Sequence, residues 1–416
     1  MKKNGFWIAI LSMACVLAVS FVCTQYIIPF FKTHYTYSET ECLTNNITDD
    51  MDAYQIRDLY SQGGAVTRVV IYSGSTAVSH GSGVCIASNG YKTTSLSTEY
   101  TASKGSYFAT NYHVIEDTIS SSYTIEVEME HKDENGDLSY PSYPSKLLWY
   151  NKDLDVAIIY TEYNFGYVSM YDGWVDYDET GRHTQSVFVI GTPLDTMHRN
   201  RVTLGGVASI TGIYANTETT VNGSSVVDNY YEDVIDLNVD ISPGNSGGGV
   251  FDKSGRVIAL ASLSMQYEDG GENSLNGATS IYPIMKAIDK VIVNNETDEN
   301  NKIYDIEKAG LKGYDANEAY AMRNYHTSRG YYLDGTYYSS VSFSSDGFYV
   351  YSSTWGLSNG SVIKSITLTQ SGQSKTYKIE DRNDLLYTLL RANTGDTLDI
   401  SYKTSLGLSA TKTVSL

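Results

Sequence analysis

The chain has 416 residues, with 29 Lys and Arg against 48 Asp and Glu, which gives a formal net charge of −19. A chain of this length is expected to form about two or three domains. The acidic balance argues against nucleic acid as a partner, because phosphate binding requires a basic surface.

The N-terminal segment is predicted to anchor the chain in a membrane. Lys2 and Lys3 precede a charge-free segment whose most apolar part, 6–23, is about long enough to span a bilayer. Residues 18–20 resemble a signal-peptidase site, but more apolar residues follow them, which favours an uncleaved anchor over residues 1–31 rather than a removed signal. The two lysines place the N-terminus in the cytoplasm and the catalytic part outside the cell membrane.

The next segments change from a polar stalk to a β-rich domain. Residues 32–63 have a mixed polar composition and predict the stalk. From residue 64 onward, short alternating apolar runs broken by Gly and Asn predict an all-β barrel; examples are 66–72, 82–86 and 124–128. Residues 89–105 and 215–229 interrupt this pattern and are predicted to be surface insertions.

The four cysteines do not define a disulfide framework. Cys15 and Cys23 lie in the apolar segment, and the spacing leaves open whether Cys42 and Cys85 pair. The sequence has no CxxC and no HExxH pattern, so neither a metal site nor a cofactor is predicted.

Two residues are candidates for acid–base chemistry. Among seven histidines, His113 alone lies in an apolar strand, 107–115, that runs into a short helical turn. A neutral imidazole there can accept a proton from a nucleophile and return it to a leaving amine. Asp155 leads directly into an apolar strand and is the candidate for the acid that orients the imidazole, with Asp153 as the alternative.

The segment 240–248 carries the candidate nucleophile, Ser246. Its flanking glycines tolerate positive φ angles and allow a substrate carbonyl to come close. The backbone N–H groups of Gly244 and Ser246 can then converge as an oxyanion hole. The order His, Asp, Ser differs from the orders found in subtilisin-type enzymes and α/β-hydrolases.

These motifs resemble the HtrA (DegP/DegS) family of trypsin-like serine proteases. The matching segments are 81–84, 110–114, 155–157, 190–194, 202–207 and 245–248. They occur in the family's order over about 64–290, and the resemblance implies two six-stranded β-barrels with the active site between them. Apolar residues at helical spacing in 282–293 predict a helix that closes a protease domain at 64–293. An acidic linker at 294–306 follows.

The remaining residues, 307–416, are predicted to be a separate unit with both helix and strands. A turn and strand at 356–363, an amphipathic helix at 383–392 and strands at 395–400 and 411–414 resemble a PDZ domain of the HtrA type, with an early strand at 335–341. The resemblance implies that Ala309, Gly310 and Leu311 hold the carboxylate of a peptide C-terminus, which adds to the sheet as a strand. The alternative is a small α/β domain that only packs on the protease.

The predicted fold class is therefore mainly β: a double-barrel trypsin-like protease domain, a small α/β PDZ domain and an N-terminal transmembrane helix. The predicted function is a membrane-anchored serine endopeptidase that acts on unfolded or misfolded extracytoplasmic proteins. The resemblance also implies a homotrimer and a preference for small aliphatic residues before the cut.

Asp240 departs from the family, which carries a small residue six positions before the nucleophile. This acid either forms the base of a pocket for Lys or Arg, or it points to solvent or binds a nearby loop amide.

Two other functions are compatible with the sequence. One anchor, one protease domain and one PDZ domain also match the layout of DegS-like sensor proteases, which cleave a single membrane-bound regulator. A pseudoprotease that only binds peptides is the non-enzymatic alternative, although the intact set of His113, Asp155 and Ser246 argues against it.

Overall fold

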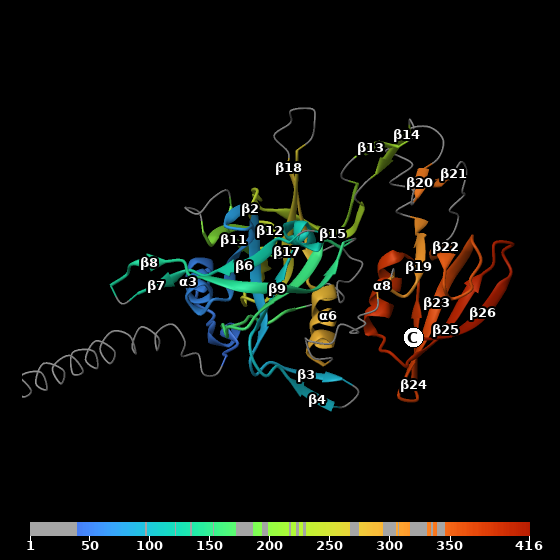
Figure 1. Cartoon of the computed structure of the whole chain (residues 1–416), viewed down its shortest axis with the longest axis horizontal. Helices are drawn as coiled ribbons and strands as arrows, with labels where there is room; N and C mark the ends of the chain where they lie inside the picture. Colours follow the sequence, from blue (N-terminus) through green and yellow to red (C-terminus); the bar gives the residue numbers. More distant parts are fainter. Residues whose placement is uncertain are drawn as a thin grey trace, which may run out of the picture.

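The computed structural model describes residues 40–416 except 96–97, 121, 134, 153, 172–185, 194–198, 216–217, 222–223, 228–229, 267–273, 294–304, 307, 317–330, 334–335 and 339–345. The described part is mainly β (Figure 1). The predicted membrane anchor at 1–31 and the alternative acid Asp153 lie outside it. Within it, no helix is long and apolar enough to cross a membrane.

The first barrel is closed by six antiparallel strands. In spatial order they are β1 (Val66–Ser73), β2 (Thr76–Ser88), β5 (Ser106–Thr110), β10 (Val156–Thr161), β9 (Ser142–Asn151) and β6 (Thr124–Glu128). Every residue of β5 and β10 is buried, since these strands pair on both edges and are covered on both faces. This explains why their sequences are continuous apolar runs rather than alternating ones.

The second barrel is closed by another six strands, so the predicted double barrel is confirmed. The strands are β11 (Ser186–Gly191), β12 (Arg201–Ala215), β15 (Tyr230–Asn238), β18 (Ser274–Ser280), β17 (Val257–Gln266) and β16 (Gly249–Phe251). Val189, Val250 and Ala261 lie in its own apolar core and are fully shielded from solvent. Phe251 and Leu260 of the same barrel instead belong to the apolar cluster of the first barrel, so the packing also crosses the boundary between the two.

The two predicted insertions each contain a β-hairpin. Residues 89–105 hold β3 (Lys92–Ser95) and β4 (Thr98–Thr101), and 215–229 hold β13 (Glu218–Val221) and β14 (Ser224–Val227). A third hairpin, β7 (His131–Lys132) with β8 (Leu138–Ser139), follows β6. The first hairpin is fixed in place, because Thr93 Oγ1 donates a hydrogen bond to Asp289 Oδ1 at 2.7 Å.

The residues before the first barrel fold onto it. A 3₁₀ turn, η2 (Leu43–Asn46), precedes α3 (Ala53–Gly63), and Asp52 caps α3 by accepting hydrogen bonds from the amides of Tyr54 and Gln55. Leu43, Ile56 and Tyr60 are all less than 4% exposed. The stalk predicted for 32–63 is therefore not present from Leu43 to Gly63, because this segment buries one apolar face against the barrels.

The described residues of the C-terminal unit include a six-stranded sheet and a helix. Its strands follow the order β19 (Leu311–Tyr314), β22 (Phe348–Ser353), β23 (Ser361–Gln370), β25 (Thr397–Lys403) and β26 (Ser409–Ser415), and β24 (Gln373–Lys378) pairs with β23. The helix is α8 (Arg382–Arg391). Thr336–Tyr338 of the predicted early strand form β21, which pairs with β20 (Tyr331–Leu333) in a separate two-stranded sheet.

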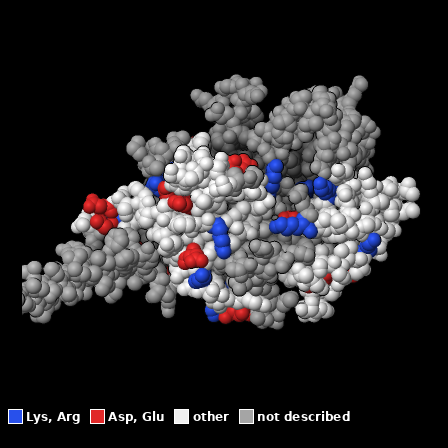
Figure 2. Space-filling model, viewed as in Figure 1, with Lys and Arg blue, Asp and Glu red and all other residues white. Residues whose placement is uncertain are grey.

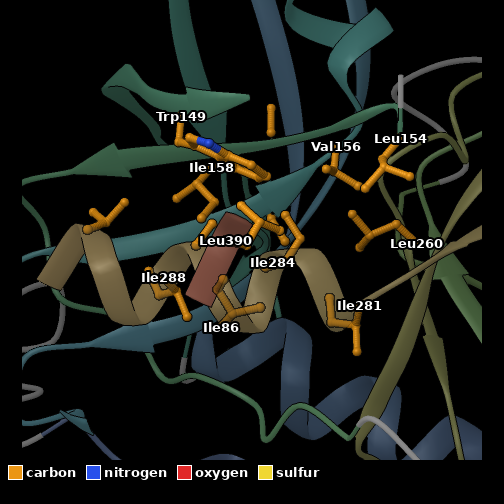
Figure 3. Packing of buried hydrophobic residues seen from close by; sticks show 14 of the residues in the cluster. Ile86, Trp149, Leu154, Val156, Ile158, Leu260, Ile281, Ile284, Ile288 and Leu390 are labelled. Carbon is orange, nitrogen blue, oxygen red and sulfur yellow. The ribbon is translucent and has the colours of Figure 1, made fainter. Parts of the chain in front are cut away.

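A helix–helix contact joins the C-terminal unit to the protease domain. The predicted closing helix is present as α6 (Tyr282–Val293). Ile284 and Ile288 of α6 belong to the same apolar cluster as Leu390 of α8 and Ile158 of the first barrel (Figure 3). Lys290 Nζ donates to the carbonyls of Arg391 at 3.1 Å and Ala392 at 2.6 Å, which places a cation at the C-terminus of α8. Burial lowers the pKa of this ammonium group to about 8.

Charged side chains of both signs lie on the described part of the face shown in Figure 2. Lys and Arg residues are interspersed there with Asp and Glu residues.

Glu128 joins the two barrels by an almost buried ion-pair cluster. Its Oε2 lies 3.0 Å from Arg68 Nη1 of β1 and 2.6 Å from Arg199 Nη2, just before β12 of the second barrel. All three side chains are no more than 11% exposed. Burial opposes ionisation, but the hydrogen bonds and charges of the two guanidinium groups outweigh it and lower the pKa of Glu128.

We predict that Glu128→Gln lowers the free energy of unfolding by about 3–5 kcal/mol, because it leaves two buried guanidinium groups uncompensated. Since the folded-state pKa is lowered, the stabilisation is present above the carboxyl's unfolded pKa and is lost as pH falls through the folded value. Urea denaturation between pH 7 and pH 3 measures both effects. Glu99→Gln, which breaks the exposed pair between Lys92 and Glu99, is the matched control and should cost less than about 1 kcal/mol. Equal losses in the two variants would contradict the prediction.

Candidate active site

His113 is positioned by the turn at the end of β5. This strand ends at Thr110, and α4 (Tyr112–Ile115) begins one residue after the buried Asn111. The short helix places the imidazole at the boundary between the barrels, with 37% of its side chain exposed. The ring is thus held by a buried strand on one side and is open to a substrate on the other.

Asp155 is fully buried where β9 turns into β10. Its φ angle of 51° lies in the left-handed region, which Asp and Asn tolerate better than most residues. Asn111 Nδ2 donates to the Asp155 carbonyl at 2.7 Å and holds this turn against the His113 segment. The local backbone therefore aims the carboxylate at the histidine rather than at solvent.

The imidazole and the carboxylate are in direct contact. His113 Nδ1 lies 2.8 Å from Asp155 Oδ2 and 3.0 Å from Oδ1, and the His113 amide donates to Oδ1 at 2.9 Å. Burial opposes protonation of the ring, but the hydrogen bond and charge of Asp155 outweigh it and raise the pKa of His113. This arrangement fixes the tautomer with a proton on Nδ1 and leaves Nε2 to accept one.

Sequence reasoning missed a further contact, made by Ser262 of β17. Its Oγ donates to Asp155 Oδ2 at 2.5 Å, the oxygen that also contacts His113 Nδ1, while the His113 amide donates to Oδ1. Ser262 and Asp155 are 107 positions apart. No motif in Ala261-Ser262-Leu263 indicates the contact, which arises only when the barrels meet.

Ser246 lies in the loop between β15 and β16. Gly244 and Gly247 adopt φ angles of 94° and 82°, which supports the predicted reason for glycine at these positions. Ser246 Oγ donates to the carbonyl of Ser262 at 3.3 Å, and within the described residues it makes no hydrogen bond to His113. The amides of Gly244 and Ser246 have no acceptor in the described part of the chain. Nucleophile, imidazole and carboxylate therefore meet at one boundary, with the hydroxyl turned toward Ser262.

The structure also shows the surroundings of two other predicted sites, Asp240 and the segment 309–311. Asp240 is exposed, as in the solvent-facing alternative, and is not the buried carboxylate that a basic-residue pocket requires. In the C-terminal unit, the Ala309 amide donates to the Asp305 carbonyl at 2.9 Å and the Leu311 amide to the Ile306 carbonyl at 3.0 Å. Two of the three amides predicted to hold a carboxylate are thus already used within the turn that precedes β19.

The remaining chemistry-bearing side chains form no second centre within the described residues. No group of three or more His, Cys, Asp or Glu side chains there is arranged to hold a metal ion. Cys42 and Cys85 are free thiols, and burial raises the pKa of Cys85 far above its ordinary value. A buried, protonated thiol is a poor nucleophile.

A protein-family model matches part of this chain. Residues 81–260 match the family model of the trypsin-like peptidase domain. No curated protein matches the chain. The chain therefore carries a trypsin-like peptidase domain and is a serine endopeptidase, as the order and context of His113, Asp155 and Ser246 predicted.

Solved structures similar to the chain include HtrA-type proteases. The HtrA-type protease AlgW with a decapeptide shares 16% identity over 88% of this chain and 98% of its own, with a TM-score of 0.47. The serine endoprotease from Yersinia pestis shares 16% identity over 88% of this chain and 97% of its own, also with a TM-score of 0.47. Deg5 shares 20% identity over 60% of this chain and 100% of its own, with a TM-score of 0.39.

We predict that kcat/KM rises with pH through an apparent pKa above about 6.5, the ordinary histidine value, because His113 must be neutral to act as a base. Asp155→Asn should lower kcat by about 10⁴-fold at neutral pH, as the corresponding change does in the well-studied Ser-His-Asp template. It should also shift the apparent pKa downward. A pH–rate profile on a peptide substrate measures both.

The matched control for this prediction is Asp252→Asn. Asp252 is also buried, but it pairs with Arg256 in the turn between β16 and β17 and makes no contact with His113. This variant should be less stable yet retain the parent's apparent pKa. An unchanged pKa in Asp155→Asn, or equal shifts in both variants, would contradict the assignment.

Proposed function

We propose that this serine endopeptidase cleaves peptide bonds through an acyl-enzyme in which Ser246 is the nucleophile, His113 the general base and acid, and Asp155 the group that orients and stabilises the imidazolium. The observation that carries the proposal is the pair of short contacts, 2.8 and 3.0 Å, from His113 Nδ1 to a buried carboxylate beside the Ser246 loop. A fully buried charge aimed at an imidazole is unusual unless the imidazole becomes charged during the reaction.

Acylation begins when the Ser246 hydroxyl turns from the Ser262 carbonyl to His113. His113 Nε2 takes the hydroxyl proton while Oγ bonds to the substrate carbonyl carbon, and the carbonyl oxygen becomes an oxyanion. The amides of Gly244 and Ser246 are the proposed donors to that oxyanion. The imidazolium then gives its proton to the leaving amine as the C–N bond breaks.

Deacylation repeats the same steps with water in place of serine. His113 takes a proton from water as the water oxygen bonds to the acyl carbon, and it then gives the proton to Ser246 Oγ as the bond from Oγ to the acyl carbon breaks and the carboxylic acid leaves. Asp155 orients the imidazole throughout, since its carboxylate contacts His113 Nδ1 and is itself held by Ser262.

For the biological role, we propose an HtrA-type enzyme that acts on unfolded or misfolded extracytoplasmic proteins. Support comes from the resemblance of the motifs and from the apolar segment that follows Lys2 and Lys3. By the same resemblance the enzyme is proposed to be a membrane-anchored homotrimer that prefers small aliphatic residues before the cut. We propose that the PDZ-like C-terminal unit binds peptide C-termini, and we assign no residues to that contact.

A second candidate is a sensor protease that cleaves one membrane-bound regulator. The observation that favours it is the direct contact of α8 with α6, where the rings of Tyr387 and Tyr282 pack edge-to-face at 4.8 Å. A C-terminal unit docked on the last helix of the protease domain has a physical means of influencing it. A constitutive quality-control enzyme does not require this contact.

We expect the full-length chain to cleave a denatured model protein and Ser246→Ala to show no turnover with unchanged folding. Removal of the nucleophilic serine lowers kcat by about 10⁶-fold in another serine protease. Mass spectrometry of the products measures cleavage and also gives the residue before each cut, which is expected to be Val, Ala or Ile.

The outcomes of this experiment separate the candidates. Cleavage by the parent alone supports the quality-control role, whereas cleavage only after a C-terminal peptide is added supports the sensor protease. Turnover by Ser246→Ala comparable to the parent would refute the triad assignment. Inactivity of the parent under every condition would favour the pseudoprotease.

A further inference from the structure

We propose that Ser82 is a positioning residue that holds the oxyanion hole in shape from the opposite barrel. The proposal rests on the proposed role of the Gly244 and Ser246 amides. Ser82 lies on β2 of the first barrel, whereas the Ser246 loop belongs to the second. Its side chain is 162 positions away from Gly244 in sequence and contacts it directly.

Ser82 makes hydrogen bonds to both ends of the segment Gly244–Ser246. Its Oγ donates to the Gly244 carbonyl at 2.7 Å, and its amide donates to the Ser246 carbonyl at 2.7 Å. The same Oγ accepts from the Thr192 amide at 2.8 Å. The residue is 1% exposed, so water cannot replace these contacts at low cost.

These contacts restrain peptide groups of the loop that would otherwise rotate easily. Gly244 has a φ angle of 94° and no Cβ, so its neighbouring peptide groups can rotate with little steric resistance. The Gly244 carbonyl is held by Ser82, and the Asn245 amide on the same peptide group donates to the Ser242 carbonyl at 2.9 Å. With both polar atoms bonded, the peptide has a single orientation, and the adjacent Gly244 amide is constrained with it.

The strand and the loop meet backbone against backbone. A Cβ on Gly247 would lie 2.1 Å from the Ser82 carbonyl oxygen, and a Cβ on Gly81 would lie 2.9 Å from the Ser246 carbonyl oxygen. Both distances are shorter than real Cβ contacts. Glycine at 81 and 247 is therefore the condition that brings the Ser82 hydroxyl within reach of Gly244.

Loss of the hydroxyl would leave two groups without a partner, the half-buried Gly244 carbonyl and the buried Thr192 amide. An unpaired polar group in such a setting is unfavourable, and rotation of the Gly244 peptide relieves part of that cost. Rotation displaces an oxyanion donor. Complete removal of one donor lowers kcat by about 10²–10³-fold in a comparable enzyme, so a displaced donor is expected to lower it by about 10–100-fold.

The test compares Ser82→Ala with Ser88→Ala in the full-length chain. Ser88 lies on the same strand, is also buried, and its Oγ donates to the Gly105 carbonyl at 3.1 Å, away from the Ser246 loop. The readouts are kcat and KM on a peptide substrate, the inhibition constant of a peptide aldehyde, and Tm. The aldehyde adds to Ser246 and places an oxyanion in the hole, so its affinity reports the hole itself.

We expect Ser82→Ala to lower kcat by about 10–100-fold with KM within about twofold, and to weaken aldehyde binding by a similar factor. Ser88→Ala should keep the parent's kcat and aldehyde affinity despite a lower Tm. Ser82→Cys keeps the size and a weak donor, so it should fall between parent and Ser82→Ala. It also decides the question if Ser82→Ala does not fold.

Equal losses of kcat in Ser82→Ala and Ser88→Ala would overturn the proposal, because the role would then be general stability. A rise in KM with unchanged kcat would overturn it as well, since substrate binding rather than the hole would have changed. A parent enzyme that shows neither turnover nor aldehyde binding would refute the proposed function, and the role of Ser82 with it.

Discussion

The site depends on one buried charge, the carboxylate of Asp155. An ionised carboxylate at zero exposure is unstable unless donors surround it, and here the His113 amide, the His113 ring and the Ser262 hydroxyl serve as those donors. His113 comes from α4 of the first barrel, and Ser262 comes from β17 of the second. The charge can therefore be buried only when the two barrels are docked, so docking the barrels and assembling the catalytic geometry are the same event.

The boundary between the barrels combines apolar packing with polar contacts, because buried apolar residues of both barrels belong to one cluster. Glu128 with Arg199, and Ser82 with Gly244, join the barrels by directional contacts at short distances. Apolar surfaces tolerate small sliding motions, whereas a hydrogen bond weakens steeply with distance and angle. A boundary held by such contacts specifies one arrangement, and an active site that must place a nucleophile and oxyanion donors to within about 0.5 Å requires that precision.

The difference between local motifs and contacts across the barrel boundary explains what the sequence could predict. His113, Asp155 and Ser246 each lie in a local pattern, namely an apolar strand into a turn, an acid before a buried strand, and a serine among glycines. Ser82 and Ser262 act through contacts between residues more than 100 positions apart. Ser82 lies in the matching segment 81–84, but neither that segment nor the sequence around Ser262 indicates the partner. The average composition of 32–63 is polar and led to the prediction of a stalk. Leu43, Ile56 and Tyr60 nevertheless provide enough apolar surface to fold Leu43–Gly63 onto the barrels. The position of Asp240, six residues before Ser246, gave no information on whether its side chain faces a pocket or solvent.

The contact of α8 with α6 lies at one end of a continuous set of contacts that reaches the catalytic acid. Ile281, just before α6, donates its amide to the Ile258 carbonyl on β17 at 3.1 Å, and the same strand carries Ser262, which binds Asp155. Contiguity alone does not couple two sites, because coupling requires an element with two arrangements whose balance both sites shift. The Ser246 hydroxyl, which rests on the Ser262 carbonyl and in the proposed mechanism turns to His113, is such an element at the catalytic end. Under the proposed sensor function, a ligand on the C-terminal unit is expected to act by moving β17, since displacement of the Ser262 carbonyl changes the energy of the resting orientation and the support of Asp155 together.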